Sequence, residues 1–294
     1  MRDLTESTAT DAVVAKLAGC GNPRLRQVMV SLVRHLHGFV REIEPTDAEW
    51  FAAIKFLTDT GHMCDDKRQE FILLSDTLGV STLVELINNR KSPGATETSV
   101  LGPFYVEGAP QLPRGASIVK DGSVADLRVH GRVHDADAKP IAGAMLDVWQ
   151  TAPNGMYDVQ DPAQPAMNLR GRFSTDADGS FEFCTIMPTP YPVPHDGPVG
   201  ALLTATGRHP WRPAHLHVIV TAPGFRSLTT ALYFEDDPYV DSDAVFGVKD
   251  SLIKEYESHP PGRAPDGKIM DRPWRSLAYT FGLRPAESAA SQAA

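Results

Sequence analysis

The sequence has 294 residues, of which 42% are hydrophobic and 22% charged, and its formal net charge at pH 7 is -9. A chain of this length can bury a substantial core in one large domain or two ordinary ones. The acidic balance argues against a nucleic acid or an anionic membrane as partner, since both would repel the protein, and favours a small-molecule ligand.

Residues 11–91 have the periodicity of several helices. Apolar side chains recur at helical intervals at Leu25, Val28, Leu32, Leu36 and Val40. A further helix is expected to begin after Thr46, and another at Ser81, where Glu85 follows. Residues 92–122 are rich in Gly and Pro, which predicts a linker or covering loop.

Beyond this loop the period changes to two. The segments LRVHGRVHD, AMLDVWQT, GRFSTDADGSFEFCTI, AHLHVIVTA and SLTTALYFE alternate or are rich in β-formers, and DADG at 176–179 predicts a hairpin turn. We therefore expect a mainly β chain with an α-helical N-terminal region: a helical domain over 1–100 and an antiparallel β-sandwich over 101–294. The tail AESAASQAA has too little apolar surface to order itself.

Two features bear on where the protein works. The cysteines Cys20, Cys64 and Cys184 are far apart and odd in number, which fits neither a disulfide framework nor a structural zinc module. No basic segment followed by an apolar run opens the chain, and no stretch of about twenty residues is apolar and uncharged. We expect reduced thiols and a cytoplasmic, non-membrane protein.

The segment RPAHLHVIVTAPG carries a candidate metal site. Alternation along a strand sends Leu216 and Val218 to one face and His215 and His217 to the other, so that the two imidazoles converge. A bare H-x-H is a weak motif and fits a pair of surface or hydrogen-bonded histidines equally well. The strand has no Asp or Glu, and no cysteine is close in sequence, so further ligands must come from elsewhere.

Three other side chains add to this candidate. Arg212 precedes the histidine strand, and a cation beside a metal suits an anionic ligand, although a solvated surface arginine is an equal alternative. Tyr157 and Tyr191 are each expected where a sandwich strand gives way to a loop. A phenol with a pKa of about 10 binds a metal only if a strong Lewis acid such as Fe(III) promotes its ionisation. For either tyrosine alone, a packed aromatic is the simpler interpretation.

Four segments occur in an order typical of one enzyme family: LDVWQTAPNGMYD, GRFSTDADGSFEF, PYPVPHDGPVG and GRHPWRPAHLHVIVTAPG. Together they resemble the intradiol ring-cleavage dioxygenases, which use O2 and non-haem Fe(III) to open catecholic rings between the two hydroxyl-bearing carbons. The resemblance extends into the helical region through EFILLSDTLGVSTLVELIN. It covers most of the chain.

The resemblance implies roles for individual residues. Tyr157, Tyr191, His215 and His217 would hold one Fe(III) per subunit, with Tyr191 and His217 axial. Tyr191 would also accept a substrate proton, and Arg212 would stabilise negative charge on the ring. The substrate pocket would comprise Leu73, Asp76, Leu101, Gly102, Pro103, Phe104 and Arg212.

Within this family, YPVPHDGPVG and GRHPWRPAHLH are most similar to the hydroxyquinol (1,2,4-trihydroxybenzene) 1,2-dioxygenases, whose product is maleylacetate. Asp76 suits a third ring hydroxyl, although a helix-surface or capping aspartate is the alternative. Ala231 and Tyr105 depart from the patterns of relatives. Catechol or chlorocatechol cleavage to cis,cis-muconates, as a main or side activity, stays open.

Two other functions also remain open. A zinc-dependent hydrolase would use the histidine pair and a bound water, and a non-enzymatic sandwich module of the transthyretin type would need the strands alone. An apolar helical region beside a self-sufficient sandwich indicates a dimer interface. The family resemblance implies a homodimer through the N-terminal helices, around a tunnel that can hold a phospholipid.

Overall fold

The computed structural model of the chain describes residues 3–66, 68–264, 267 and 269–286. The chain divides into two compact units, Met1–His62 and Met63–Ala294. The functional division into 1–100 and 101–294 stays a prediction. Apart from Ala286, the tail expected to be disordered lies outside the described residues.

The first unit is helical, as predicted. It contains α1 (Glu6–Lys16), the short 3-10 helix η1 (Leu17–Gly19), α2 (Pro23–Ile43) and α3 (Asp47–His62). The Asn22 side chain caps α2 by accepting from the backbone N–H of Leu25 at 3.0 Å. Before α3, the Thr46 backbone donates to Glu49 at 2.8 Å and the Glu49 backbone donates to the Thr46 hydroxyl at 3.3 Å, a reciprocal capping box at the expected helix start.

The second unit begins with helices that lead into irregular chain. Helix α4 (Glu70–Thr77) is followed by α5 (Val80–Asn88), one residue before the expected start at Ser81. Residues 89–126 contain no helix or named strand, so the absence of regular structure expected over 92–122 is confirmed. Helix α6 (Pro198–Ala205) comes later in the chain, within the β-rich part of this unit.

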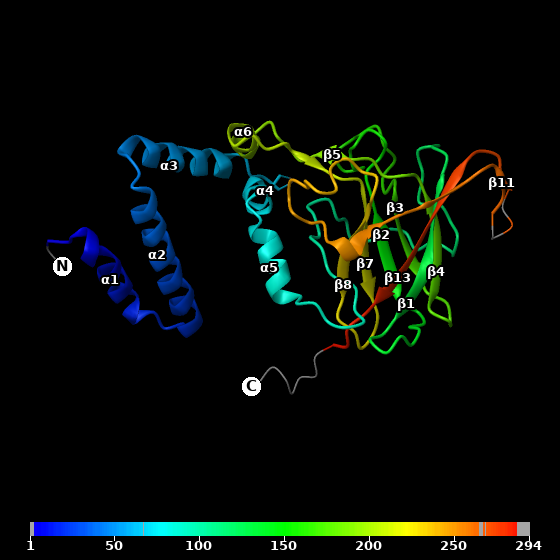
Figure 1. Ribbon diagram of the computed structural model, residues 1–294, viewed down its shortest axis with the longest axis horizontal. Coiled ribbons are helices and arrows are strands. Elements are labelled where there is room, and N and C mark those ends of the chain that lie inside the picture. Colours follow the sequence, from blue (N-terminus) through cyan, green and yellow to red (C-terminus); the bar gives the residue numbers. More distant parts are fainter. Residues whose placement is uncertain (1–2, 67, 265–266, 268, 287–294) are drawn as a thin grey trace. The chain divides into compact units, whose positions relative to one another are not determined.

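Two main sheets form the rest of this unit (Figure 1). The five-stranded sheet has the order β3 (Arg170–Ser174), β2 (Met145–Trp149), β7 (His215–Thr221), β8 (Leu228–Phe234), β9 (Ile253–Lys254). The four-stranded sheet has the order β10 (Glu257–His259), β13 (Trp274–Gly282), β1 (Leu127–His134), β4 (Ser180–Thr185). Two small ribbons pair β5 (Tyr191–Pro192) with β6 (Trp211–Arg212) and β11 (Gly262–Arg263) with β12 (Ile269–Met270), and a short 3-10 helix, η2 (Asp250–Leu252), precedes β9.

The main core lies between the two sheets. Leu146 and Leu216 from one sheet and Val129 and Phe183 from the other belong to one buried cluster, and each is at most 1% exposed. Burying such a side chain contributes about 1.5–3 kcal/mol, so the inward faces stabilise the sandwich and leave the outward face of β7 available for polar groups. The predicted sandwich fold is confirmed.

Not every strand pair is antiparallel. Strand β13 runs parallel to β1 along the whole of β1, and β9 runs parallel to β8. A parallel pair needs a long connection, and here β13 comes from the far end of the chain to lie beside β1. Alternation indicates which face a residue occupies but not the direction of the neighbouring strand.

The chain turns at 176–179 as expected, but it does not form the expected hairpin. The turn forms, since the Gly179 N–H donates to the Asp176 carbonyl at 2.9 Å and Gly179 has φ +74°. However, the turn joins β3 of one sheet to β4 of the other. The turn residues therefore predict that the chain reverses, but not which strands pair. Strand β3 pairs with β2 and β4 pairs with β1, so the chain crosses between the sheets at this point.

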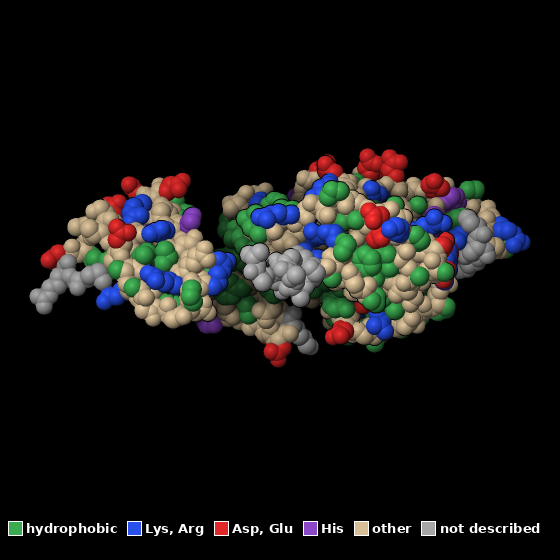
Figure 2. Space-filling model, turned by 90° about the horizontal axis from the view of Figure 1, so that it is seen from below, with side chains coloured by type: hydrophobic (Ala, Val, Ile, Leu, Met, Phe, Trp, Pro, Cys, Tyr) green, Lys and Arg blue, Asp and Glu red, His purple; other side chains and the backbone are tan. Residues whose placement is uncertain are grey.

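Within the described part of the chain, no helix combines the length and apolarity needed to cross a membrane. Figure 2 shows Lys and Arg side chains between Asp and Glu side chains on one face. That face therefore presents mixed charge, without the single basic stripe typical of nucleic-acid binding.

Candidate active site

Strand β7 brings two histidines together on its outward face. Leu216 and Val218 enter the core, while the Nε2 atoms of His215 and His217 lie 3.0 Å apart. Both side chains are buried, at 2% and 1% exposure. The convergence expected from alternation is therefore present, and the alternative of surface histidines is excluded.

The environment keeps both imidazoles neutral. His215 Nδ1 lies 2.7 Å from the Pro213 carbonyl, so Nδ1 carries the proton and Nε2 has a free lone pair. Burial, followed by the charge of Arg212, lowers the pKa of His215 from 6.5 to about 3. Burial also holds the pKa of His217 well below its usual value, and its ring stacks on Trp149 with centroids 4.7 Å apart. Neutral imidazole is the form that binds a metal.

Two tyrosines complete the cluster. Their hydroxyl oxygens lie 3.4 Å apart, and both side chains are buried. Tyr157 lies in a loop, where its N–H donates to Gln160 at 3.0 Å and its ring stacks on Phe104. Tyr191 differs from the expectation of a loop residue, because it opens the short strand β5. Burial, with the neighbouring Tyr191, raises the pKa of Tyr157 well above its usual value.

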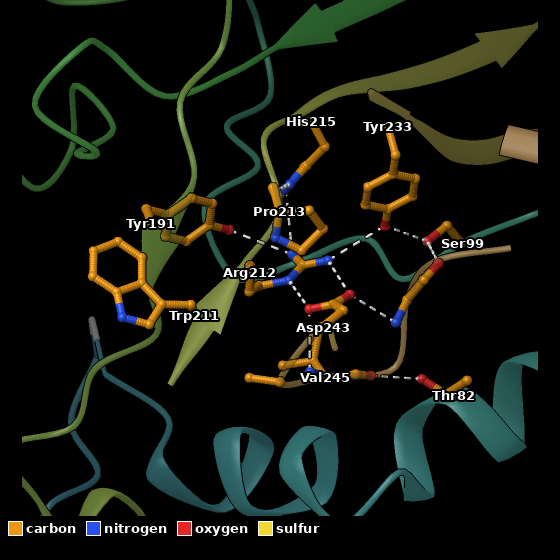
Figure 3. Close-up of polar contacts among 12 residues, drawn as sticks. Thr82, Ser99, Tyr191, Trp211, Arg212, Pro213, His215, Tyr233, Asp243 and Val245 are labelled. Atoms are coloured by element: carbon orange, nitrogen blue, oxygen red, sulfur yellow. Dashed lines mark hydrogen bonds and ion pairs between the residues drawn. The ribbon is translucent and has the colours of Figure 1, made fainter. Parts of the chain in front are cut away.

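Arg212 links the tyrosine and histidine parts of the site. It pairs with Tyr191 across β5 and β6 and is only 3% exposed, so the surface-arginine alternative is wrong. Its Nη1 lies 3.4 Å from the Tyr191 hydroxyl and 3.3 Å from His215 Nε2 (Figure 3). The site therefore contains a buried cation directed at two of the candidate ligands.

Sequence reasoning missed three residues around Arg212. Asp243 forms an ion pair with the guanidinium at 3.0 Å, and the Tyr233 hydroxyl lies 3.4 Å from Nη2 and 3.2 Å from the Ser99 hydroxyl. Tyr233 comes from β8, whereas Ser99 and Asp243 come from loops. Asp243 is 31 positions from Arg212, and no local pattern marks it as a partner.

A cavity of about 710 Å³ opens beside this cluster. Its lining includes six of the seven residues expected in the substrate pocket: Leu73, Asp76, Gly102, Pro103, Phe104 and Arg212. Tyr191 and Tyr105 also line it. Leu101 lies outside this lining and is 43% exposed, so its contribution stays a prediction.

The loop that contains Gly102 comes close to the histidine pair. Gly102 has φ +74°, and a Cβ at this position would lie 3.5 Å from the His217 ring. The left-handed backbone favours glycine. This allows the cavity wall to pass directly over His217.

Asp76 projects into the cavity from α4. Burial raises its pKa above the ordinary value of 3.8, while hydrogen bonding from Ser81 and the charge of Arg212 oppose that rise. It is therefore a desolvated carboxyl rather than a solvated surface group.

The two positions that depart from family patterns have ordinary packing roles. The Tyr105 hydroxyl donates to Asp147 at 3.2 Å, and its ring lies 5.0 Å from that of Trp149. Ala231 is the cross-strand partner of His217 and is fully buried. Both residues therefore support the wall behind His217.

The donor set identifies the kind of metal that fits. Among the described residues, no group of three or more His, Cys, Asp or Glu side chains is placed to hold a metal. A zinc site would therefore lack its usual third nitrogen, sulfur or carboxylate ligand. The two buried phenols instead supply oxygen donors suited to a strongly Lewis-acidic ion, so the four residues fit ferric iron.

Two family models match the chain. The model described as "Dioxygenase" matches residues 100–285, and that described as "Catechol dioxygenase N terminus" matches residues 22–96.

Similar proteins cover nearly the same length. A hydroxyquinol 1,2-dioxygenase from a Rhizobium species is 53% identical over 86% of each chain, and a 6-chlorohydroxyquinol 1,2-dioxygenase from Cupriavidus pinatubonensis is 50% identical over 89% of this chain and 95% of the relative. The solved structure of a hydroxyquinol 1,2-dioxygenase from Pseudomonas putida has a TM-score of 0.91 and 52% identity, covering 96% of this chain and 99% of that one. A catechol 1,2-dioxygenase from Pseudomonas arvilla has a TM-score of 0.81 and 29% identity, covering 98% and 94%.

Proposed function

The chain belongs to the intradiol ring-cleavage dioxygenase family, and from that premise we propose that it is a hydroxyquinol 1,2-dioxygenase. It would open 1,2,4-trihydroxybenzene with O2 between the adjacent hydroxylated carbons and release maleylacetate. Support comes from the relatives: those named for hydroxyquinol are 44–53% identical, whereas a catechol 1,2-dioxygenase from Candida albicans is 40% identical and a solved one from Pseudomonas arvilla is 29% identical. Because the chain belongs to this family, the zinc-hydrolase and transthyretin-type alternatives are rejected.

The observation that carries this proposal is the convergence of two imidazoles and two phenols at one side of the cavity. We infer that Tyr157, Tyr191, His215 and His217 hold one Fe(III). The ion would promote ionisation of bound phenols and draw electron density from a bound aromatic diol, so that the ring becomes reactive towards O2.

Tyr191 would move a proton in this reaction. As a phenolate, its oxygen would accept the proton of an entering substrate hydroxyl. The Arg212 Nη1, 3.4 Å away, directs a hydrogen bond at that oxygen and stabilises its charge. Tyr191 also lines the cavity, so its side chain is open to a substrate bound there.

Arg212 would stabilise negative charge that develops on the ring. Its guanidinium is buried and lines the cavity, where a charge acts more strongly than in water. The pairing of β5 with β6 fixes the backbone of Arg212 beside that of Tyr191.

Asp76 would recognise the third hydroxyl of hydroxyquinol. Its carboxylate accepts a hydrogen bond that catechol, without that hydroxyl, does not offer. A site built for a substrate hydroxyl rejects the analogue that lacks it, because the polar group is then left unpaired. Leu73 and Phe104 supply apolar surface for the ring.

Steady-state oxygen uptake with hydroxyquinol, catechol and 4-chlorocatechol tests the assignment. We expect the highest kcat/KM with hydroxyquinol, and maleylacetate as its product. A higher kcat/KM with catechol and formation of cis,cis-muconate would instead make the protein a catechol 1,2-dioxygenase.

We also propose that the protein is a homodimer joined through its N-terminal helices, with a phospholipid held between them. Helix α2 supports this, because it has no buried residue and exposes a long apolar face: Leu25, Val28, Leu32, Leu36, Phe39, Val40 and Ile43. Monomers rarely leave such a face in water. Native mass spectrometry would report both the dimer and the lipid, and a monomeric, lipid-free mass would contradict the proposal.

A further inference from the structure

The catalytic role proposed for Arg212 raises the question of what holds its guanidinium in place. Arg212 is buried, so its charge and its five N–H donors need partners inside the protein. The Nε and Nη2 atoms meet the two carboxylate oxygens of Asp243 at 3.0 and 3.3 Å. The Nη1 atom is left facing Tyr191 and His215 (Figure 3).

We propose that Asp243 is a positioning residue for the ring-cleavage reaction, which aims Nη1 of Arg212 at the metal-binding side of the cavity. A two-point pairing fixes the plane of a guanidinium as well as its location, which a single contact does not. Because Asp243 occupies Nε and Nη2, the Nη1 edge of the guanidinium is the one presented to substrate. This inference rests on the role proposed above for Arg212.

Asp243 is itself held rigidly. One carboxylate oxygen accepts from the Val245 N–H at 3.3 Å and the other from the Gly247 N–H at 2.9 Å. The loop is tied to β6 through the Ala244 N–H and the Trp211 carbonyl at 3.1 Å. Asp243 therefore reaches Arg212 from a loop that is anchored to the neighbouring residue of the same strand.

The same loop has two further attachments. Thr82 of α5 donates to the Val245 carbonyl at 3.0 Å, and Ser99 donates to the Gly247 carbonyl at 2.8 Å. Phe246 within the loop has φ +58°, a conformation that side chains other than glycine rarely adopt. A strained residue persists where surrounding contacts over-determine it, as they do around Asp243.

The packing around the fork leaves little freedom. A Cβ at Gly247 would lie 3.0 Å from Arg212 Nη2 and from the Tyr233 hydroxyl, and 3.2 Å from Asp243 Oδ2. A methyl group here would require Arg212, Tyr233 or Asp243 to move by a few tenths of an ångström. Gly247→Ala thus crowds the guanidinium and its partners without removing any charge.

The test is a double-mutant cycle on the iron-loaded protein. We expect Asp243→Asn to retain iron and to lower kcat roughly 10- to 100-fold, the usual effect of removing a residue that orients a functional side chain. Its tyrosinate-to-iron absorption band should also shift, because Nη1 no longer lies in the same place beside Tyr191. In an Arg212→Leu background, Asp243→Asn should lower kcat no further, while it should raise the Tm by removing an unpaired buried carboxylate.

Two further variants keep the test decisive. If Asp243→Asn fails to fold, Gly247→Ala should still lower kcat and shift the band. Glu85→Gln is the matched control: it breaks the half-buried ion pair with Lys249 at 2.8 Å, close to the same loop but away from Arg212. We expect this control to lower the Tm and leave kcat and the band unchanged.

The outcomes separate the two claims. If Arg212→Leu alone retains full kcat, the proposed role of Arg212 fails. If Arg212→Leu is slow but Asp243→Asn has wild-type kcat and spectrum, or lowers kcat by the same factor in both backgrounds, the positioning role of Asp243 is overturned.

Discussion

At the scale of single residues, the site combines groups that burial would normally disfavour. Two imidazoles, two phenols and an arginine share one buried region, and only the arginine has a carboxylate partner, Asp243, within ion-pair distance in the described structure. Burial lowers the pKa of both histidines, which therefore stay neutral, and raises the pKa of Tyr157, which therefore keeps its proton. Binding of a ferric ion would therefore release phenolic protons, and the metal–ligand bonds would offset the free-energy cost of burying these polar groups.

His217→Ala should abolish iron binding. The variant removes one of four donors and leaves the cluster unable to complete a coordination shell. Iron content by atomic absorption and the visible tyrosinate band report the result. His195→Ala is a suitable control, since His195 is not one of the four candidate ligands and its Nδ1 lies 3.1 Å from the Val193 carbonyl. Stoichiometric iron and full turnover in His217→Ala would refute the ligand assignment.

Asp76→Asn should separate hydroxyquinol from catechol. A hydrogen bond to a charged group contributes about 1.5–3 kcal/mol, so kcat/KM for hydroxyquinol should fall roughly 10- to 100-fold. Catechol lacks the third hydroxyl and serves as the internal control. An equal loss with both substrates would show that Asp76 supports the fold rather than recognising the substrate.

The same variant has a predicted pH dependence. Because the folded-state pKa of Asp76 is raised, the carboxyl stabilises the fold below its unfolded pKa of about 3.9, and this contribution is lost as pH rises through the folded value. Asp76→Asn should therefore raise the Tm at neutral pH, with a smaller gain in acid. Thermal melts from pH 4 to pH 8 measure this, and a gain that grew towards acid would contradict it.

At the scale of elements, strand β7 performs two functions with its two faces. Leu216 and Val218 anchor it in the core, and this fixes the outward direction of His215 and His217. The hydrogen-bonded neighbours β2 and β8 hold it in the centre of the five-stranded sheet. The position of the histidine pair therefore depends on the packing of residues that never touch the substrate.

Leu216→Ala should destabilise the protein by about 2–5 kcal/mol, since Leu216 is fully buried and its loss leaves a cavity. Iron binding should survive in the fraction that stays folded, because the outward face is unchanged. Thr221→Ala, at the exposed end of the same strand, should change stability by less than about 0.5 kcal/mol. Urea titration of both variants would test this, and equal stabilities would contradict the account of β7.

The sequence predicted these elements unevenly, for physical reasons. Period-two alternation is local, so the faces of β7 and the convergence of His215 and His217 were predictable. The parallel β1–β13 pair and the crossing at 176–179 depend on contacts between distant segments. Asp243 was missed for the same reason, because its partner lies 31 residues away. For each tyrosine the sequence alone favoured a packed aromatic, and the family resemblance implied its role as a ligand.

At the scale of the whole molecule, the proposed homodimer gives the apolar face of α2 a function. Leu32 and Leu36 are each 53% exposed in the single chain. The apolar character of such a face suits a permanent contact rather than a transient one, since obligate interfaces are the more hydrophobic.

Introducing charge on this face should separate the subunits. We expect Leu32→Asp with Leu36→Asp to give a monomer by size-exclusion chromatography with light scattering, because buried unpaired carboxylates oppose association. Gln27→Asp, on another face of α2, should leave the mass unchanged. A double variant with the mass of the parent protein would place the interface elsewhere.

The central claim, that this chain cleaves hydroxyquinol as an intradiol dioxygenase, is tested most directly by the fate of the oxygen atoms. Iron-loaded protein would be given hydroxyquinol under heavy-isotope oxygen gas, and the product would be analysed at once by mass spectrometry. Our account predicts maleylacetate with one heavy oxygen atom in each of the two newly formed carboxyl groups. A product with a single heavy atom, or one in which the ring has opened outside the pair of adjacent hydroxylated carbons, would contradict it.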